Sequence, residues 1–160
     1  MAEDLKEKRL DDVLKTKRMK AYRRLCHELG LRDTKQKRAI LEAVLGLDTH
    51  PTADEIHAHI TTTHPDVSRT TVYRGLEAFA RMGLITKACH PGSVTRYDRN
   101  IDIHHHLICL HCDAVIDITD TGLDALSIPD TSDFNFEVQD FRVQLRGVCG
   151  SCRETDPKEE

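Results

Sequence analysis

The sequence predicts an α+β fold, a winged-helix domain followed by a small α/β domain. Helical patterns come first, and the last three of them lead into a β-hairpin, which is the order of a winged helix. Beyond Asp98 the pattern changes to short strands that carry His and Cys residues. Only 39% of the 160 residues are apolar and 4% are aromatic. Two small cores that depend on metal or on a partner subunit therefore fit better than one large core.

The first predicted helix is long and highly charged. Residues 3–29 contain neither Gly nor Pro and are dense in Lys, Arg, Glu and Leu, so they predict a helix that stops at Gly30. We divide the chain into an N-terminal helical extension, a winged-helix domain, an α/β domain and a polar tail. Their expected ranges are residues 1–25, 26–97, 98–154 and 155–160.

The next two helices are predicted from their apolar spacing and from a capping motif. In residues 34–45, "TKQKRAILEAVL", apolar side chains recur at helical spacing, and basic ones gather at the front. Thr52, with Glu55 three residues on, forms a capping box, so a third helix should begin near Ala53.

The fourth helix, "SRTTVYRGLEAFARMG", has an apolar stripe and a polar stripe. Ser68 is a natural N-cap and Gly83 a natural stop. The apolar stripe should be buried, and it consists of Val72, Leu76 and Phe79. The polar stripe consists of Thr70, Tyr73, Arg74 and Glu77. Two short β-type runs, "LITKA" and "VTRYD", then enclose a turn at "CHPGS" and complete the hairpin.

The C-terminal half should contain three strands. The runs "HHHLICL" and "AVIDI" predict two strands around a tight connection, and "LDAL" predicts a short helix. Alternation through residues 136–149, "FEVQDFRVQLRGVC", predicts a third strand. The folded part should end at "CGSCRE".

The net charge of −4 conceals a division between the two halves. Residues 1–90 carry 17 Lys and Arg against 13 Asp and Glu, whereas residues 91–160 carry 6 against 14. This pattern indicates a polyanion-binding module joined to a cation-binding one. The sequence contains neither an apolar leader nor a run of about 20 apolar residues, so we expect a cytoplasmic protein without a membrane partner. Paired cysteines in that compartment are typically metal ligands rather than disulfides.

Two C-x-x-C pairs predict a structural zinc site, one per subunit. The four ligands would be Cys109, Cys112, Cys149 and Cys152. Two such knuckles complete a closed tetrahedral Cys₄ shell, which has no open position for catalysis. A redox C-x-x-C would require a βαβ context, which is absent here. Cys26 and Cys89 have no partner at ligand spacing and are expected to be ordinary thiols.

The histidines point to a second site, separate from the thiolates. In a strand, His104 and His106 share one face while His105 and Cys109 share the other. If Cys109 pairs with Ala114 across the turn, Asp117 lies directly opposite His106. An N₂O set of this kind suits Fe²⁺, Mn²⁺, Ni²⁺ or Zn²⁺. The residues alone leave open that these histidines are solvated surface groups.

Six motifs in this order resemble the ferric uptake regulator (Fur) family of bacterial metal-responsive repressors. They are "HPTADEI", "SRTTVYRGLEAF", "RYD", "HHHLICLHC", "VIDI" and "GVCGSC", and the resemblance runs from about Leu31 to Arg153. It implies a homodimer, formed by the C-terminal domain, that represses transcription on an A·T-rich palindromic operator. It also implies that His50 and Asp98 join His104, His106 and Asp117 in a His₃Asp₂ regulatory site for Fe²⁺ or Mn²⁺, one per subunit.

The branch within the family rests on Asp117. The resemblance associates Asp in "VIDI" with peroxide-sensing (PerR-like) members and Glu with iron-uptake members. Zinc-uptake members usually supply a Cys near the position of Asp98, where this sequence has Asp. The family's other common metal site requires a His near Asp140, and none is present there. A run of three histidines is also found in nickel-responsive members. We therefore expect a peroxide sensor, with an iron-, nickel- or zinc-uptake regulator as the alternative.

The polar stripe of the 68–82 helix is the expected major-groove face. Tyr73 and Arg74 suit bases or phosphates, and the helix N-terminus suits phosphates. That N-terminus carries Ser68, Arg69, Thr70 and Thr71. The resemblance assigns a minor-groove contact to Arg32, just before the second helix. The alternative is an ordinary solvated helix face.

Two other classes of protein fit the sequence less well. A metalloenzyme would need a substrate pocket and a positioned base, and no nucleophile motif or Gly-rich phosphate loop is present, so we expect neither catalytic residues nor a small organic substrate. A passive metal store would not explain the basic winged-helix half.

Overall fold

The computed structural model describes residues 2–47, 49–88 and 94–155, and within these ranges it describes side chains from residue 12 to residue 154. The chain divides into two compact units, Met1–Ile101 and Asp102–Glu160, and each is described by itself. No helix in the described residues is long and apolar enough to cross a membrane.

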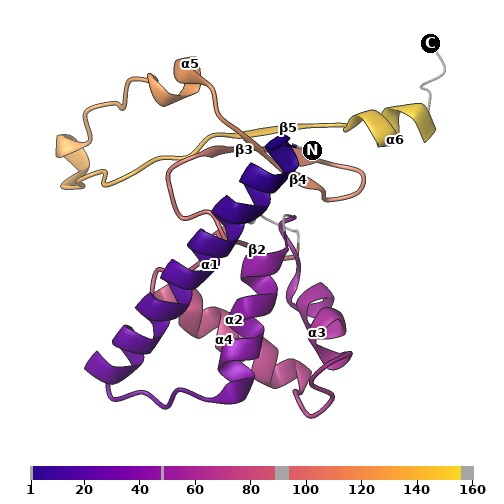
Figure 1. The fold of residues 1–160 in the computed structure, drawn as a ribbon. Helices are drawn as coiled ribbons and strands as arrows, with labels where there is room; N and C mark the ends of the chain where they lie inside the picture. The colour runs from indigo at the N-terminus through magenta and orange to yellow at the C-terminus, as the bar shows by residue number, and fades with distance from the viewer. Residues whose placement is uncertain (1, 48, 89–93, 156–160) are drawn as a thin grey trace. The chain divides into compact units, whose positions relative to one another are not determined.

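The first unit has the predicted order of three helices and a hairpin behind a long N-terminal helix (Figure 1). Strands β1 and β2 form a two-stranded antiparallel sheet in which Lys87 faces Tyr97. The predicted turn between them, residues 89–93, lies outside the described residues. The elements are α1 (Ala2–Glu28), α2 (Lys35–Gly46), α3 (Ala53–Thr61), α4 (Arg69–Arg81), β1 (Thr86–Ala88) and β2 (Arg96–Asp98).

The ends of these helices follow the local signals in the sequence. Gly30 and Gly83 have positive φ angles of +63° and +67°. A residue with a side chain would be strained in this conformation, which is why glycine ends both helices. Thr52 accepts from the Glu55 backbone N–H while the Glu55 carboxylate accepts from the Thr52 N–H, so the capping box is formed. Ser68 caps α4 through the Thr71 N–H.

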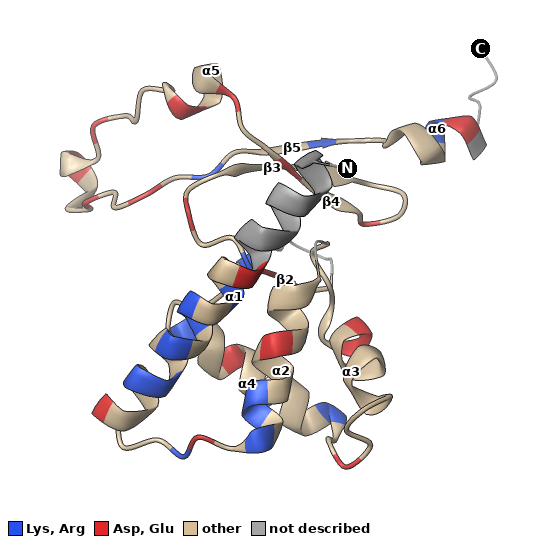
Figure 2. Ribbon diagram, viewed as in Figure 1, with Lys and Arg blue, Asp and Glu red and all other residues tan. Residues whose placement is uncertain are grey.

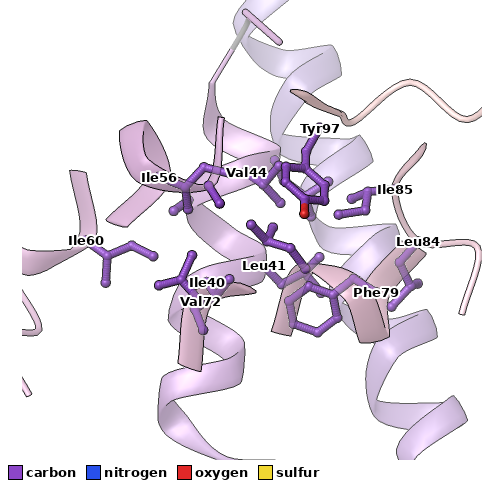
Figure 3. Packing of buried hydrophobic residues seen from close by; sticks show 14 of the residues in the cluster. Ile40, Leu41, Val44, Ile56, Ile60, Val72, Phe79, Leu84, Ile85 and Tyr97 are labelled. Atoms are coloured by element: carbon purple, nitrogen blue, oxygen red, sulfur yellow. The ribbon is translucent and has the colours of Figure 1, made fainter. Parts of the chain in front are cut away.

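The core of the first unit is built from the apolar stripes of its helices (Figure 3). Val72, Leu76 and Phe79, predicted to be buried, are each at most 1% exposed. Gly75 lies between them, and a Cβ built there would approach Ile40 Cδ1 to 3.2 Å. This glycine therefore lets α4 lie close against α2.

The second unit contains a three-stranded sheet in the order β4-β3-β5. Strands β3 and β4 are antiparallel, whereas β5 runs parallel to β3. The predicted register is confirmed, because Cys109 N–H donates to Ala114 O over 2.9 Å and His106 faces Asp117. The elements are β3 (His105–Cys109), β4 (Val115–Ile118), α5 (Thr121–Asp124), η1 (Ser132–Phe134), β5 (Gln144–Gly147) and α6 (Gly150–Thr155).

Two predictions for this unit need correction. The strand expected over residues 136–149 is wrong in length, since only Gln144–Gly147 is a strand. Strand β3 begins at His105, and β5 pairs with it from Gln144 onward in parallel register. The early residues of the 136–149 run therefore have no part of β3 to pair with, although their side chains alternate in character. The short helix α6, which contains Cys152, was not predicted at all.

Candidate metal centres and DNA-binding face

The two C-x-x-C pairs meet in one cluster within the second unit. Cys109 is the last residue of β3, and Cys112 lies in the turn that follows. Cys149 directly precedes α6, and Cys152 lies within it. Their Sγ atoms all lie within 4.8 Å of one another, and those of Cys112 and Cys149 are 3.8 Å apart. Thiolates arranged tetrahedrally at about 2.3 Å from Zn²⁺ would be separated by about 3.8 Å. The cluster therefore has the dimensions of a Cys₄ zinc site.

The electrostatics of this cluster also fit a divalent cation. Hydrogen bonds from backbone N–H groups lower the pKa of Cys109 to about 6. The largest contribution comes from the Cys149 N–H, which donates to Cys109 Sγ over 3.4 Å. The neighbouring thiols of Cys149 and Cys112 raise the pKa of Cys152 to about 12. Four thiolates this close repel one another, so all four ionise together only when a cation compensates their charge.

Three of the predicted regulatory ligands converge on one point of the second unit. The Nε2 atoms of His104 and His106 are 3.0 Å apart, and they lie 3.3 Å and 3.5 Å from the Asp117 Oδ1. His104 Nδ1 is 2.8 Å from the Asp102 carbonyl oxygen, which can only accept. The proton of a neutral His104 is therefore on Nδ1, and its Nε2 has a lone pair directed at the other two ligands.

The middle histidine of the run lies elsewhere, as strand parity predicts. His105 is fully buried and accepts the Val143 N–H at Nδ1 over 3.0 Å. Its Nε2 lies 3.1 Å from the Asp124 Oδ1, and its ring packs on Phe141 with 5.8 Å between centroids. These contacts tie α5 and the chain before β5 to the sheet, so His105 has a structural role in this unit.

The remaining two predicted ligands meet inside the first unit. His50 Nε2 lies 3.5 Å from Asp98 Oδ2, and both side chains are buried. Strand β2 holds the segment of His50 in place, because Arg96 donates to the His50 carbonyl over 2.9 Å. The Tyr97 N–H donates to the Pro51 carbonyl over the same distance. An imidazole and a carboxylate are thus fixed side by side on adjoining segments.

A hydrogen bond connects this pair of segments to α4. The buried Tyr97 hydroxyl donates to Glu77 Oε1 over 3.2 Å, and Glu77 also pairs with Lys87 Nζ at 2.7 Å. The hydrogen bond from Lys87 is the main cause that lowers the pKa of Glu77, and Tyr97 contributes. Glu77 is therefore an ionised acceptor that joins the predicted recognition helix to the strand of Asp98.

Most of the polar stripe of α4 is exposed and borders a hollow, whereas Glu77 is half-buried. Thr70 and Arg74 are exposed, and the Tyr73 residue is 41% exposed. The hollow has a volume of about 680 Å³, and its lining includes Thr34, Lys37, Tyr73, Arg74 and Arg81. Sequence reasoning missed Arg81, although its position seven residues after Arg74 places it on the same helix face.

Most of the other predicted DNA-binding residues form hydrogen bonds or ion pairs with residues of the first unit. Arg69 pairs with Asp54 at 2.6 Å, and the hydroxyl of Ser68 caps α4. The Thr71 hydroxyl lies 2.9 Å from that of Ser68. Arg32 lies exposed in the connection between α1 and α2.

The first turns of α2 and α4 lack acidic residues, whereas α3 has Asp54 and Glu55 there. The first turn of α2 carries Lys35 and Lys37 instead. Cations are unfavourable at the positive end of a helix dipole, and anions are favourable there. These two helix ends are therefore suited to phosphate.

Comparisons with known proteins are consistent with this arrangement. The model of the "Ferric uptake regulator family" matches residues 28–146. The peroxide-responsive repressor PerR of Staphylococcus aureus is 32% identical over 127 residues, which cover 79% of this chain and 86% of that protein.

Among solved structures, the ferric uptake regulator Fur of Helicobacter pylori superposes with a TM-score of 0.72 at 21% identity. The superposition covers 87% of this chain and 93% of that one, whose structure is described as having three functional metal-binding sites. The ferric uptake regulator of Francisella tularensis with iron gives a TM-score of 0.67 at 25% identity, over 78% and 96% of the two chains.

Proposed function

This chain belongs to the ferric uptake regulator family of metal-responsive, DNA-binding transcriptional regulators, and we propose that it is a repressor that senses peroxide. The observation that carries the proposal is the convergence of His104, His106 and Asp117, with His104 held in the tautomer that a metal ion requires. The family consists of regulators and not of enzymes.

The proposed regulatory site takes ligands from both units. His50 and Asp98 would supply one part, and His104, His106 and Asp117 the other. Because the two sets belong to different units, an ion that binds all five favours the one arrangement of the units in which all five reach it. That arrangement would be the one that binds DNA. Two carboxylates and three imidazoles suit Fe²⁺ or Mn²⁺.

The second proposed ion is structural. Zn²⁺ would be held by Cys109, Cys112, Cys149 and Cys152, in a closed shell that leaves no position for a substrate. It would fix the end of β3 to α6 in a unit that has few buried apolar side chains of its own.

Peroxide sensing is supported by Asp117 and by the similarity to the S. aureus repressors. The five ligands of the His₃Asp₂ site would hold Fe²⁺, which would supply the redox chemistry that cleaves the O–O bond of hydrogen peroxide beside them. In the net reaction, the imidazole of His50 or His104 would be oxidised by two electrons and take up one peroxide oxygen at a ring carbon, and the other oxygen would leave as water. An oxidised imidazole is a poorer ligand, so the preference for the DNA-binding arrangement would disappear and the repressor would leave DNA.

The proposed DNA contacts follow the exposed face of α4. Tyr73 and Arg74 would reach base edges or phosphates in the major groove. Arg32 would enter an A·T-rich minor groove. The N-terminus of α4 would contact phosphates, through Ser68, Arg69, Thr70 and Thr71.

The sheet of the second unit is the proposed homodimer interface. Leu107 faces Ile116 on β4 and Leu145 on β5, so the three side chains form an apolar row across one face. Ile116 and Leu145 are 50% and 44% exposed, which is a large apolar exposure for so small a unit. A second copy that covers this row would give each palindromic half-site its own winged helix.

Metal analysis followed by DNA binding tests the proposal. Protein loaded with Fe²⁺ should dissociate from DNA after hydrogen peroxide, and its peptides containing His50 or His104 should gain about 16 Da. Protein loaded with Mn²⁺ should bind DNA and resist peroxide. The Asp117→Glu variant should keep metal-dependent binding with a weaker peroxide response.

The opposite result has a clear meaning. An iron-loaded protein that stays on DNA and gains no oxygen is a metal-uptake regulator of the same family. A protein whose DNA affinity does not respond to any divalent metal contradicts the regulatory site itself.

A further inference from the structure

The positive charge of the first unit is concentrated in one continuous stretch. Residues 13–38 contain ten Lys and Arg against two Asp and Glu, whereas the rest of residues 1–90 contains seven against eleven. Figure 2 shows the Lys and Arg segments along α1 and at the start of α2. Exposed helix faces ordinarily mix both signs of charge, so this concentration calls for a partner.

Within α1 the cations occupy the face opposite to the core. Tyr22 and Cys26 of α1 are buried in the core of the first unit. Lys17, Lys20, Arg23 and Arg24 are all exposed, and we call these four residues the α1 basic stripe. At about 100° of rotation per residue, they fall within about one third of the helix circumference, centred away from Tyr22 and Cys26. The stripe is therefore a single surface about 10 Å long.

The stripe is not neutralised by its neighbours in the part of the chain that the structure describes. Arg24 pairs with Glu28 at 3.6 Å, an exposed contact between side chains one helical turn apart. Lys17, Lys20 and Arg23 form no ion pair with any described residue. An exposed pair such as Arg24–Glu28 contributes little and leaves the cation accessible.

The recognition helix itself supplies little positive charge. Of its three arginines, Arg69 is engaged by Asp54, and Glu77 adds a negative charge to the same helix. Attraction to the phosphate backbone provides most of the sequence-independent affinity of a DNA-binding protein. Only Arg74 and Arg81 remain on α4 for that attraction, so cations outside α4 have to supply much of it.

We propose that the α1 basic stripe binds the phosphate backbone of duplex DNA, as a second contact surface continuous with Arg32 and the first turn of α2. The inference rests on the proposed function, because it presumes that the winged helix binds DNA. The stripe leads into Arg32 through a connection of a few residues, and α2 then begins with Lys35 and Lys37. It carries no base-reading geometry of its own, so its contribution is to affinity and not to sequence preference.

The salt dependence of DNA binding tests this surface. The test variant is K17Q/K20Q/R23Q/R24Q, which keeps good helix formers and removes four charges. The matched control is K17R/K20R/R23K/R24K, which keeps every charge. Because the phosphate contribution does not depend on sequence, sheared genomic DNA serves as the probe. Thermal unfolding and circular dichroism of both variants confirm that α1 is still folded.

The slope of log K against log salt should become shallower by about 0.9 for each phosphate that the glutamine variant no longer neutralises. The change should therefore be about 1.8 or more if the stripe neutralises two phosphates. The control should keep the wild-type slope. The ratio of operator to genomic-DNA affinity should stay the same in both variants.

Two results would overturn the proposal, and a third would contradict the proposed function on which it rests. An unchanged slope in the glutamine variant, with the wild-type protein bound, would show that the stripe does not touch DNA. An unchanged slope with an altered oligomeric state would assign the stripe to an acidic protein surface, such as that of a second copy. A wild-type protein that fails to bind any DNA would instead contradict the proposed function.

Discussion

At the scale of single residues, the two proposed metal sites differ in how their ligands are held. The thiols of the Cys₄ cluster are held close together by the end of β3 and by α6, and their charges oppose one another until an ion binds. The histidine cluster is held by outer hydrogen bonds, such as that from His104 to the Asp102 carbonyl. Removing one ligand should therefore damage the first cluster more than the second.

Substituting Cys109 by Ser should abolish zinc binding. Backbone N–H groups, chiefly that of Cys149, lower the pKa of the Cys109 thiol and so favour its thiolate. The variant should contain less than one zinc per chain and unfold at a lower temperature. Cys26→Ser is the control, since Cys26 is buried in the other unit. A C109S protein with full zinc and an unchanged Tm would refute the assignment.

Substituting Arg74 by Ala should weaken specific DNA binding. Arg74 is exposed on the polar stripe of α4, where it can reach guanine in the major groove. Removing a base contact costs about 1–3 kcal/mol and relaxes the preference at one base pair. Titration of operator and genomic DNA would separate this from a role in binding phosphate, whose removal weakens both equally. Unchanged operator affinity would place the recognition face elsewhere.

At the scale of elements, β3 serves both proposed sites. His106 and Asp117 face one side of the sheet, and Cys109 faces the other. This division could be predicted from the sequence, because a tight turn fixes the register of a hairpin and the period of two then places every side chain. The helix ends were predictable for the same kind of reason, since Ser68, Thr52 and Gly83 act locally.

Elements that depend on distant partners could not be predicted as well. Alternation extends over residues 136–149, yet the length of β5 is limited by where β3 begins. The contact between Tyr97 and Glu77 joins residues 20 apart, and no local pattern announces it. The place of Asp98 beside His50 was expected only from the family resemblance, because their approach depends on how β2 pairs with the segment around Pro51.

The Tyr97→Phe variant should show whether α4 responds through β2 to metal bound at the proposed ligands His50 and Asp98. Phe keeps the ring but lacks the hydroxyl that donates to Glu77. We expect a decrease of about 0.5–1.5 kcal/mol in the free energy of unfolding. The increase in DNA affinity on adding Mn²⁺ should shrink, while Mn²⁺ affinity without DNA should hold.

The matched control is Tyr22→Phe, which removes the hydroxyl of another fully buried tyrosine packed against α4. It should leave the metal response of DNA binding unchanged. Equal effects of the two variants on that response would mean that the Tyr97 hydroxyl has no special role.

At the scale of the whole molecule, charge and apolar surface are divided between the units. Residues 13–38 hold the positive charge, and residues 91–160 carry 14 acidic residues against 6 basic ones. The exposed apolar row of the sheet lies in the acidic part. The two proposed contacts, with DNA and with a second copy, therefore use different parts of the chain.

Placing a charge in the apolar row should separate the subunits of the proposed homodimer. Leu145→Glu puts a carboxylate opposite Leu107, where a second copy would have to bury it without a partner. Sedimentation equilibrium should show a shift from dimer to monomer, together with weaker operator binding. Leu126→Glu is the control, because Leu126 is similarly exposed but lies outside the strands. Dimers of equal affinity in both variants would exclude this face.

Gly75 also limits how the protein can change. Replacing a glycine inside a helix by alanine usually adds about 0.5–1 kcal/mol of stability, which makes this position an obvious target for thermostabilisation. Here the added methyl group would come within 3.2 Å of Ile40 Cδ1, so the Ile40 side chain would have to shift by a few tenths of an ångström. The gain in helix propensity is therefore offset at this position by the cost of moving Ile40 away from α4, so heat tolerance is hard to gain here without disturbing the packing of α4 on α2.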